Sequence, residues 1–262
     1  MIDSPPDSSL SVPLCVTVIT VCWNALADLQ LTAASVQRHT HDRLFHVIVD
    51  GGSTDGTMAW LQEHRQQFAV AYSERDNGIY DAMNKALART PETDWIIFLN
   101  AGDVFHDDDV VRRSVPLLRR RDVDFVFGDV CISDAAGPGK PRIYPSRRSA
   151  RLEMPGCHQS CFVRANLMKR LRFDLNYKIA GDFECWLRAT HQGRSKTAFA
   201  DHAIATIAPE GFSARNEPIL QLEYTRAIRT HVNALAAGWW LLKRKARRMV
   251  LKLRPSPTSE SA

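Results

Sequence analysis

Three segments in the first 103 residues combine carboxylates with glycines or asparagines in patterns that suit nucleotide or metal binding. The first, over residues 49–57, reads Val-Asp-Gly-Gly-Ser-Thr-Asp-Gly-Thr. An acid followed by glycines and hydroxyls predicts a tight turn that a ligand can approach closely, and Asp50 could accept hydrogen bonds from a base edge or a ribose. The segment lacks the Gly-Lys-Ser/Thr ending of a phosphate-binding P-loop. For Asp55 the sequence favours the alternative role of a helix N-cap.

The second segment, residues 73–84, reads Ser-Glu-Arg-Asp-Asn-Gly-Ile-Tyr-Asp-Ala-Met-Asn and would place Asp81 and Asn84 on one face of a helix. The third reads Phe-Leu-Asn-Ala-Gly-Asp and ends on Asp103. A carboxylate just past a buried strand suits Mg²⁺ or Mn²⁺, which complete their coordination with diphosphate oxygens and water. Spacing alone leaves open that Asp103 and Asp107 instead cap the next helix.

Strand and helix signals alternate around these segments. Apolar, β-branched runs predict strands, and helical spacing of apolar residues predicts helices between them; the strands are expected at residues 16–21, 45–49, 70–72 and 95–99. This alternation predicts a parallel sheet, in which ligands bind beyond the carboxyl ends of the strands. Asn24, Asp50 and Asp103 each follow a predicted strand, so we expect the three segments to meet at one edge of the sheet.

The second half of the chain is less regular. The sequence predicts a strand at 125–130, a loop at 135–145, a strand within 157–163, a helix at 181–190 and a long helical stretch from about Pro218. The resulting prediction is an α/β fold with a single nucleotide-binding, mostly parallel sheet flanked by helices over residues 13–215. A basic helical extension follows over 216–254, and disordered tails are expected at 1–12 and 255–262.

The segments together resemble the family 2 glycosyltransferases, a group with the glycosyltransferase-A fold. The resemblance rests on Thr-Val-Cys-Trp-Asn ending at Asn24, Asp-Gly-Gly-Ser-Thr-Asp-Gly-Thr from Asp50, Asp-Asn-Gly-Ile-Tyr-Asp-Ala-Met-Asn-Lys from Asp76 and Leu-Asn-Ala-Gly-Asp ending at Asp103. Cys-His-Gln-Ser at 157–160 and Ile-Ala-Gly-Asp-Phe-Glu at 179–184 look like the family's acceptor-side motifs.

The resemblance implies a donor site for a nucleotide-linked sugar. Asp50 would contact the base, Asp76 would lie on base or ribose, and Asn24 would belong to the same nucleotide site. Asp103 would hold Mg²⁺ or Mn²⁺ on the donor diphosphate. The family's usual metal motif is Asp-x-Asp, and here Asn100, a weaker and uncharged ligand, stands at its first position.

The resemblance also implies an acceptor side. Asp182 would be the general base that takes the proton of the acceptor hydroxyl, and a single carboxylate is enough for an inverting attack. His158 and Gln159 would line the sugar and acceptor pocket. Glu184 is assigned to the same pocket and is a lesser candidate for the general base. The alternatives are an N-cap role for Asp182 and a hydrogen-bonded core position for His158.

Charge is concentrated at the C-terminus. The net charge is +5, and residues 239–254 contribute +7 without an acid, so the rest of the chain is slightly acidic. The basic residues surround an apolar stripe, which predicts a basic amphipathic helix; the stripe consists of Trp239, Leu242, Ala246, Met249 and Leu253. We expect this helix to bind an anionic membrane surface that carries a lipid-linked acceptor, the alternative being a helix packed on the domain through its stripe.

The sequence shows neither a secretory signal nor a long apolar span, so a cytoplasmic protein, peripheral on the inner face of the membrane, is expected. Nucleic acid is not an expected partner. The six cysteines form no CxxC pair and are expected to be reduced. A sugar nucleotidyltransferase would need a basic, Gly-rich loop after the first strand, which Val-Cys-Trp-Asn does not provide. A non-catalytic nucleotide-sugar-binding or scaffold protein would not need Asp182.

Overall fold

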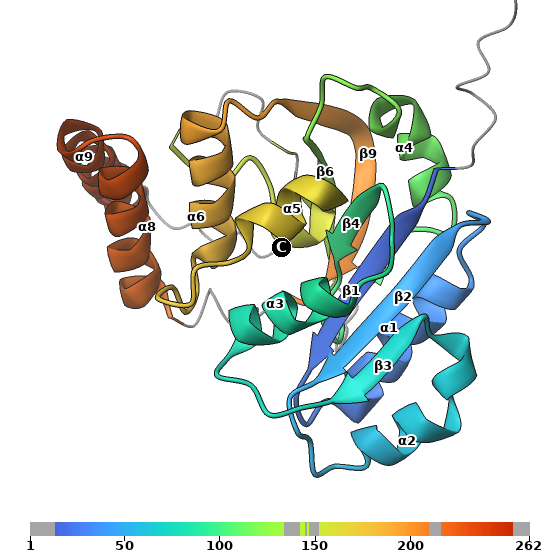
Figure 1. Cartoon of the computed structure of the whole chain (residues 1–262). Helices are drawn as coiled ribbons and strands as arrows, with labels where there is room; N and C mark the ends of the chain where they lie inside the picture. The colour runs from blue at the N-terminus through green and yellow to red at the C-terminus, as the bar shows by residue number, and fades with distance from the viewer. Residues whose placement is uncertain (1–13, 134–141, 145, 147–151, 210–215, 254–262) are drawn as a thin grey trace, which may run out of the picture.

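A computed structural model describes residues 14–133, 142–144, 146, 152–209 and 216–253 (Figure 1). The strands are β1 (Val16–Cys22), β2 (Leu44–Asp50), β3 (Val70–Ser73), β4 (Trp95–Phe98), β5 (Val104–Phe105), β6 (Phe125–Ile132), β7 (Arg142–Tyr144), β8 (Cys161–Arg164) and β9 (Thr197–Ile207). The helices are α1 (Leu26–Gln37), α2 (Thr57–Glu63), α3 (Ile79–Arg89), α4 (Val110–Leu118), α5 (Ala165–Leu171), α6 (Gly181–Leu187), α8 (Glu217–His231) and α9 (Ala234–Leu253).

These strands form one sheet in the order β3-β2-β1-β4-β8-β6-β9-β5, and β7 pairs with β6. The first four strands of this order run parallel, and β8 is antiparallel to both β4 and β6. The predicted α/β fold with a mostly parallel sheet is therefore confirmed. Because β1, β2 and β4 are parallel neighbours, their carboxyl ends lie at one edge, which is where the predicted donor residues were expected.

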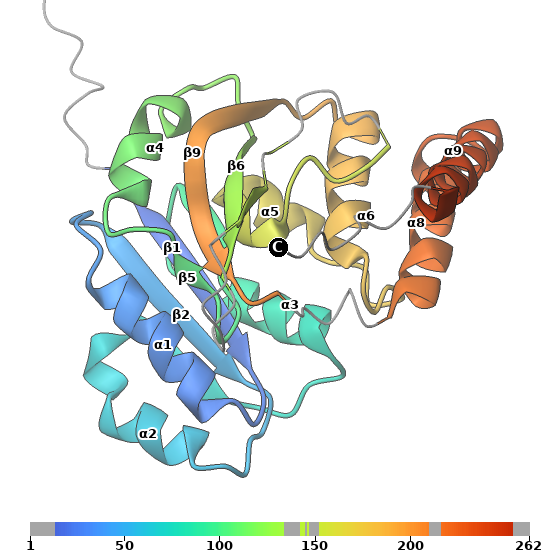
Figure 2. The ribbon, with the colours of Figure 1, turned by 180° about the vertical axis from the view of Figure 1, so that it is seen from behind.

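Both faces of the sheet are covered, as the two opposite views show (Figures 1 and 2). Alternate residues of β1 point to opposite sides, as expected for a strand buried on both faces. Ile19 and Val21 pack in a core with residues of α3, α5 and α6, whereas Val16 and Val18 pack with α4 and β9. A third cluster, which includes Leu29 and Ile48, fills the space under α1 and α2.

Three features of the second half differ from the prediction. The strand expected within 157–163 begins at Cys161, and a 3₁₀ turn, His158–Ser160, precedes it. The sequence analysis did not predict β9, because Asp201 and His202 interrupt its apolar pattern at a bulge in the pairing with β6. Of the predicted loop 135–145, residues 142–144 form β7, and the other residues lie outside the described ranges, as do both predicted tails.

The predicted C-terminal extension is built into the core as a pair of helices, α8 and α9. The Tyr224 ring stacks on Phe183 of α6 with centroids 3.9 Å apart, and Trp240 of α9 stacks on Tyr224 at 5.6 Å. Trp240 is only 2% exposed. Within the described residues no helix is long and apolar enough to cross a membrane.

Candidate active site

The loop after β2 is folded around Asp50. This carboxylate is fully buried and accepts hydrogen bonds from the Ser53 N–H at 2.9 Å, the Gly52 N–H at 3.2 Å and the Ser73 hydroxyl at 2.5 Å. Asn24, with φ 48°, donates its N–H to the Ser53 hydroxyl at 2.7 Å and accepts from the Thr54 N–H at 2.8 Å. Asp50 and Asn24 therefore fix the shape of the loop, and a contact of either with a nucleotide stays a prediction.

A cleft of about 310 Å³ opens beside this loop at the carboxyl ends of β1 and β4. Asp76 and Asn100 line it, together with Trp23, which is 68% exposed. Asp76 packs directly on Gly51: a Cβ there would lie 2.4 Å from a carboxylate oxygen of Asp76. The close approach of the two loops therefore requires glycine at position 51.

The other polar residues of the first two segments hold the backbone. Asp55 accepts from the N–H groups of Leu26 and Thr57, at 3.0 and 3.1 Å. The N-cap of α2 is Gly56, so the predicted N-cap role of Asp55 is wrong: the carboxylate stands one residue earlier and links the first N–H groups of α1 and α2. Asn84 exchanges two hydrogen bonds of 2.9 Å with the backbone of Phe173. These bonds join α3 to the segment that leads towards α6.

Asp103 contacts Asn100, which lines the cleft, and is 9% exposed. It accepts a hydrogen bond from the Asn100 N–H at 3.1 Å. Burial raises the pKa of the Asp103 carboxyl to about 6, although the nearby His158 and hydrogen bonds from Gln159 and Asn100 act in the opposite direction. A buried carboxylate with a raised pKa would be stabilised by a neighbouring cation.

Asn100 supplies a second oxygen at this point. Its side-chain amide lies 3.2 Å from Nε2 of His158, and its Oδ1 is buried with no hydrogen-bond partner in the described part of the chain. An unpartnered oxygen beside a buried carboxylate fits Mg²⁺ or Mn²⁺, which prefer oxygen ligands. The described residues contain no group of three or more His, Cys, Asp or Glu placed to bind a metal, so most ligands would come from the donor diphosphate and water.

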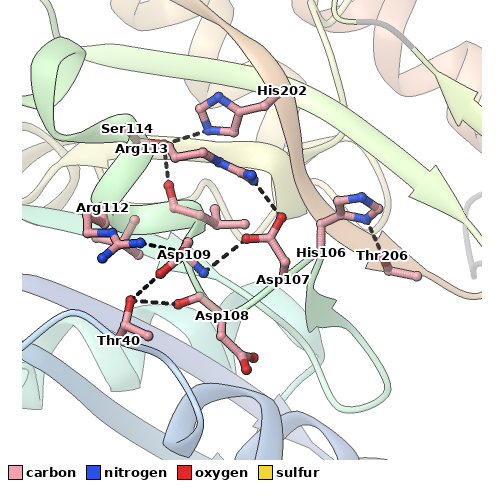
Figure 3. Close-up of polar contacts among 12 residues, drawn as sticks. Thr40, His106, Asp107, Asp108, Asp109, Arg112, Arg113, Ser114, His202 and Thr206 are labelled. Carbon is pink, nitrogen blue, oxygen red and sulfur yellow. Dashed lines mark hydrogen bonds and ion pairs between the residues drawn. The ribbon is translucent and has the colours of Figure 1, made fainter.

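The alternative in which Asp103 and Asp107 cap α4 is wrong, because the N-cap of α4 is Asp109 and Asp107 instead holds the turn before the helix (Figure 3). Asp107 accepts from the Asp109 N–H at 3.0 Å and pairs with Arg113 at 2.6 Å. Asp109 is hydrogen-bonded to Thr40 at 2.6 Å. This network lies outside the cleft and leaves the Asp103 carboxylate to the candidate active site.

His158 connects Asn100 to Asp182, which stands in the first turn of α6. His158 Nδ1 lies 3.3 Å from one Asp182 carboxylate oxygen, and the other accepts the Phe183 N–H at 2.8 Å. Burial by itself lowers the pKa of His158, but the hydrogen bond and charge of Asp182 and the charge of Asp103 outweigh it and raise the pKa above the usual value.

The helix that carries Asp182 packs closely on Tyr80 of α3. A Cβ at Gly181 would lie 2.7 Å from the Tyr80 ring. The Tyr80 hydroxyl donates to the Ile179 carbonyl at 2.7 Å and lies 3.4 Å from Asp182. A small cavity of about 40 Å³ adjoins Asp182 and His158, and its other walls are apolar or thiol side chains.

The assignment of Glu184 to the acceptor pocket needs correction. Glu184 is 2% exposed and pairs with Arg188 and His231, each at 2.8 Å, and it does not line the cavity beside Asp182. Residues two apart on a helix point about 200° apart, so Asp182 and Glu184 cannot share one pocket. Gln159 does lie in the site, through its hydrogen bond to Asp103.

Sequence analysis missed Glu223 of α8. Its carboxylate accepts hydrogen bonds from three consecutive backbone N–H groups, those of Lys178, Ile179 and Ala180, the last of which lies two residues before Asp182. No local motif could have identified it, because a single glutamate within a helix is an ordinary surface residue.

On α9 the two described residues of the predicted apolar stripe, Trp239 and Leu242, do not lie on the packing face. Trp240 and Ala237 are buried against the domain, whereas Leu235, Trp239 and Leu242 are 87%, 57% and 68% exposed. The exposed residues recur at four- and three-residue spacing, so they share one outward face of the helix.

Comparisons with known proteins identify the family of this chain. The sequence profile of the family described as Glycosyl transferase family 2 matches residues 17–179. An uncharacterized glycosyltransferase of Mycobacterium tuberculosis is 34% identical over 187 residues, which cover 66% of this chain and 68% of the relative. This chain therefore belongs to glycosyltransferase family 2.

Solved structures are similar in fold. TarS of S. aureus in complex with UDP-GlcNAc has a TM-score of 0.63 at 15% identity, over 84% of this chain and 68% of that chain. A mannosyltransferase of Pyrobaculum calidifontis in complex with GDP-Man and Mn²⁺ has a TM-score of 0.60 at 17% identity, over 91% and 81%. The fold is thus the glycosyltransferase-A fold.

Proposed function

We propose that this member of glycosyltransferase family 2 transfers a sugar from a UDP- or GDP-linked donor to an acceptor hydroxyl, with inversion, in polysaccharide or lipid-linked glycan biosynthesis. The observation that carries the proposal is the position of His158, which contacts Asn100 at the donor cleft and Asp182 at the first turn of α6. The solved structures with UDP-GlcNAc and with GDP-Man and Mn²⁺ support this donor class.

The donor would lie in the cleft at the ends of β1 and β4. Asp76 would contact its base or ribose, and the loop held by Asp50 and Asn24 would give the ligand close access to the backbone. Asp103 and Asn100 would hold Mg²⁺ or Mn²⁺. When bound, this ion would stabilise the negative charge of the departing diphosphate.

Asp182 would act on the acceptor. Its carboxylate takes the proton of the acceptor hydroxyl while that oxygen attacks the anomeric carbon, and the bond from this carbon to the diphosphate breaks. Attack from the face opposite the diphosphate inverts the configuration without a second catalytic carboxylate. One carboxylate oxygen of Asp182 accepts the Phe183 N–H, and Nδ1 of His158 contacts the other oxygen.

A direct test measures donor binding and turnover separately. Calorimetry with UDP and GDP, with and without Mn²⁺, would identify the nucleobase of the donor. Hydrolysis or transfer of the matching sugar donors would show catalysis. Metal-dependent binding with measurable turnover is expected. Tight binding of a nucleotide sugar without hydrolysis, and without transfer to any acceptor in a membrane extract, would favour a non-catalytic binding protein.

A second part of the proposal concerns the acceptor's location. The outward face of α9 presents Leu235, Trp239 and Leu242, and residues 239–254, which include two of these, carry a charge of +7. Apolar side chains next to many cations are typical of helices that lie on anionic lipid. We infer that α9 holds the enzyme on the inner face of the cytoplasmic membrane, where a lipid-linked acceptor would be available.

Vesicle sedimentation tests this binding. The variant with Leu235, Trp239 and Leu242 all changed to Ser should lose binding to vesicles of phosphatidylcholine with phosphatidylserine, and wild-type binding should weaken as salt rises. The change leaves the buried Trp240 in place, so nucleotide binding should persist. Unchanged sedimentation of the triple variant would exclude this face as the docking surface.

A further inference from the structure

Helix α8 inserts a buried carboxylate into the loop that leads to Asp182. Glu223 is 7% exposed. One of its oxygens accepts the Lys178 N–H at 2.8 Å, and the other accepts those of Ile179 and Ala180 at 2.9 and 2.8 Å. Three consecutive N–H groups that converge on one carboxylate form charge-assisted hydrogen bonds, which are stronger than neutral ones.

These bonds fix the start of the helix that carries Asp182. Ala180 is the residue before the first turn of α6, where N–H groups have no partner within the helix. Glu223 satisfies this position from α8, and on the other side the Tyr80 hydroxyl donates to the Ile179 carbonyl at 2.7 Å. The backbone before Asp182 is therefore held through its N–H groups and through a carbonyl.

The neighbouring residue on α8 reinforces the same attachment. Tyr224 stacks on Phe183 with an interplanar angle of 4°, and Phe183 follows Asp182 directly. Side chains from α8 thus contact the backbone two residues before Asp182 and the ring one residue after it. A shift of α8 would move Asp182 relative to His158.

We propose that Glu223 is a positioning residue, which holds Asp182 at the distance from His158 and from the donor cleft that the transfer requires. The inference rests on the proposed role of Asp182 as base. Glu223 itself touches neither substrate. Its effect should appear in turnover, because a displacement of about 1 Å can reduce a rate by about 10²-fold, whereas the donor cleft lies at the ends of β1 and β4 and should bind as before.

The chemistry of the three bonds explains why a carboxylate serves here. A glutamine at position 223 could keep its oxygen on Ile179 and Ala180, but its NH₂ group would then face the Lys178 N–H, donor against donor. Glu223→Gln should therefore retain two of the three bonds, and Glu223→Ala should retain none.

The test compares these variants with Glu217→Gln, the same substitution on the same helix. Glu217 is hydrogen-bonded to Arg244 of α9 and to Gln221 of α8. Turnover should fall about 10-fold in Glu223→Gln and about 10²-fold in Glu223→Ala, as expected for a misplaced base. The dissociation constant of the nucleoside diphosphate with Mn²⁺ should change less than about threefold in each, a split typical of an interaction that serves the chemical step. Glu217→Gln should match wild type.

The outcomes separate this inference from the proposed function. If wild type transfers sugar and Asp182→Asn does not, but folded Glu223→Gln and Glu223→Ala keep wild-type turnover, the positioning role is wrong and the base assignment stands. A parallel loss of donor affinity and turnover, or a Glu223→Gln protein unfolded at the assay temperature, also overturns it, since Glu223 would then support the fold as a whole. If wild type transfers no sugar, the proposed function itself fails.

Discussion

Replacing Asp103 by Asn is expected to stabilise the fold at neutral pH and to abolish metal-dependent donor binding. The two effects share one cause, which is the burial of the Asp103 carboxylate. Burial raises its pKa from 3.8 to about 6, so the folded chain is less stable when this group is ionised. Asparagine has nearly the same shape and removes the charge.

The size of the effect follows from the pKa shift. A shift of about 2 pKa units corresponds to about 3 kcal/mol at 1.36 kcal/mol per unit. Because the folded-state pKa is raised, ionisation of Asp103 takes nothing from the free energy of unfolding below pH 3.8, and its full cost is reached as pH rises through 6. Near pH 4 the free energy of unfolding of Asp103→Asn should therefore equal that of wild type. At pH 7.5 it should exceed the wild-type value by up to about 3 kcal/mol, which corresponds to a melting temperature higher by roughly 6–12 °C.

Thermal unfolding at pH 4, 5.5 and 7.5 in chelator measures this difference. Adding Mn²⁺ with UDP or GDP should then reverse the order at pH 7.5. Ligand at 1,000 times its dissociation constant stabilises wild type by about 4.1 kcal/mol, which exceeds the variant's advantage of about 3 kcal/mol, and the variant should gain much less. This reversal distinguishes a functional carboxylate from one that is only poorly placed.

Asp107→Asn provides the matched control. Burial raises the pKa of Asp107, but the hydrogen bonds from the Asp109 N–H and Arg113, with the charge of Arg113, together outweigh it and hold the pKa below its usual range. The sign is therefore opposite: this substitution should lower stability at pH 7.5 and leave donor binding intact. If Asp103→Asn is destabilised at pH 7.5, or binds the nucleotide with Mn²⁺ as tightly as wild type, the reasoning about Asp103 is refuted.

Three further predictions concern the acceptor side. Asp182→Asn should reduce turnover by about 10²-fold or more with donor affinity nearly unchanged, and lost affinity with normal turnover would contradict a base role. Because the pKa of His158 is raised, its pair with Asp182 stabilises the fold fully below pH 6.5, and this contribution is lost as pH rises above the folded-state pKa. The free energy of unfolding in urea should therefore differ between wild type and His158→Gln at pH 6, and the difference should shrink by pH 8.5. A pH-independent difference would exclude that pair as its source. Gly181→Ala would place a Cβ 2.7 Å from the Tyr80 ring and should cost about 1–3 kcal/mol of stability along with turnover, whereas an unchanged melting temperature and rate would mean that the ring moves freely aside.

The donor side of the site followed from sequence because its residues are local to strands. Apolar runs fixed the ends of β1, β2 and β4, and parallel pairing brings such ends to one edge. The sequence alone therefore predicts that Asp103 and Asn100 lie together. The burial of Asp50 could not be predicted in this way, because it depends on Ser73, which contacts Asp50 from the adjacent strand.

The acceptor side depends on contacts between distant segments, which sequence patterns do not encode. The motif at 179–184 contains two acids, and only the rotation between positions on α6 directs Asp182 to His158 and Glu184 to Arg188. Glu223 has no sequence signal at all, because its partners are backbone N–H groups.

The two roles proposed for the C-terminal helices belong to one connected structure, and this determines how they can be separated. Trp240 of α9 packs on Tyr224, and Tyr224 packs on Phe183 beside Asp182. Deleting α9 would therefore expose Tyr224 and disturb Asp182 as well as remove the basic segment, so a truncated enzyme without turnover would say nothing about the membrane. Substitutions on the outward face of α9 leave the stacked rings in place. A variant altered there should keep its turnover on a water-soluble acceptor and lose only the turnover that requires the membrane surface.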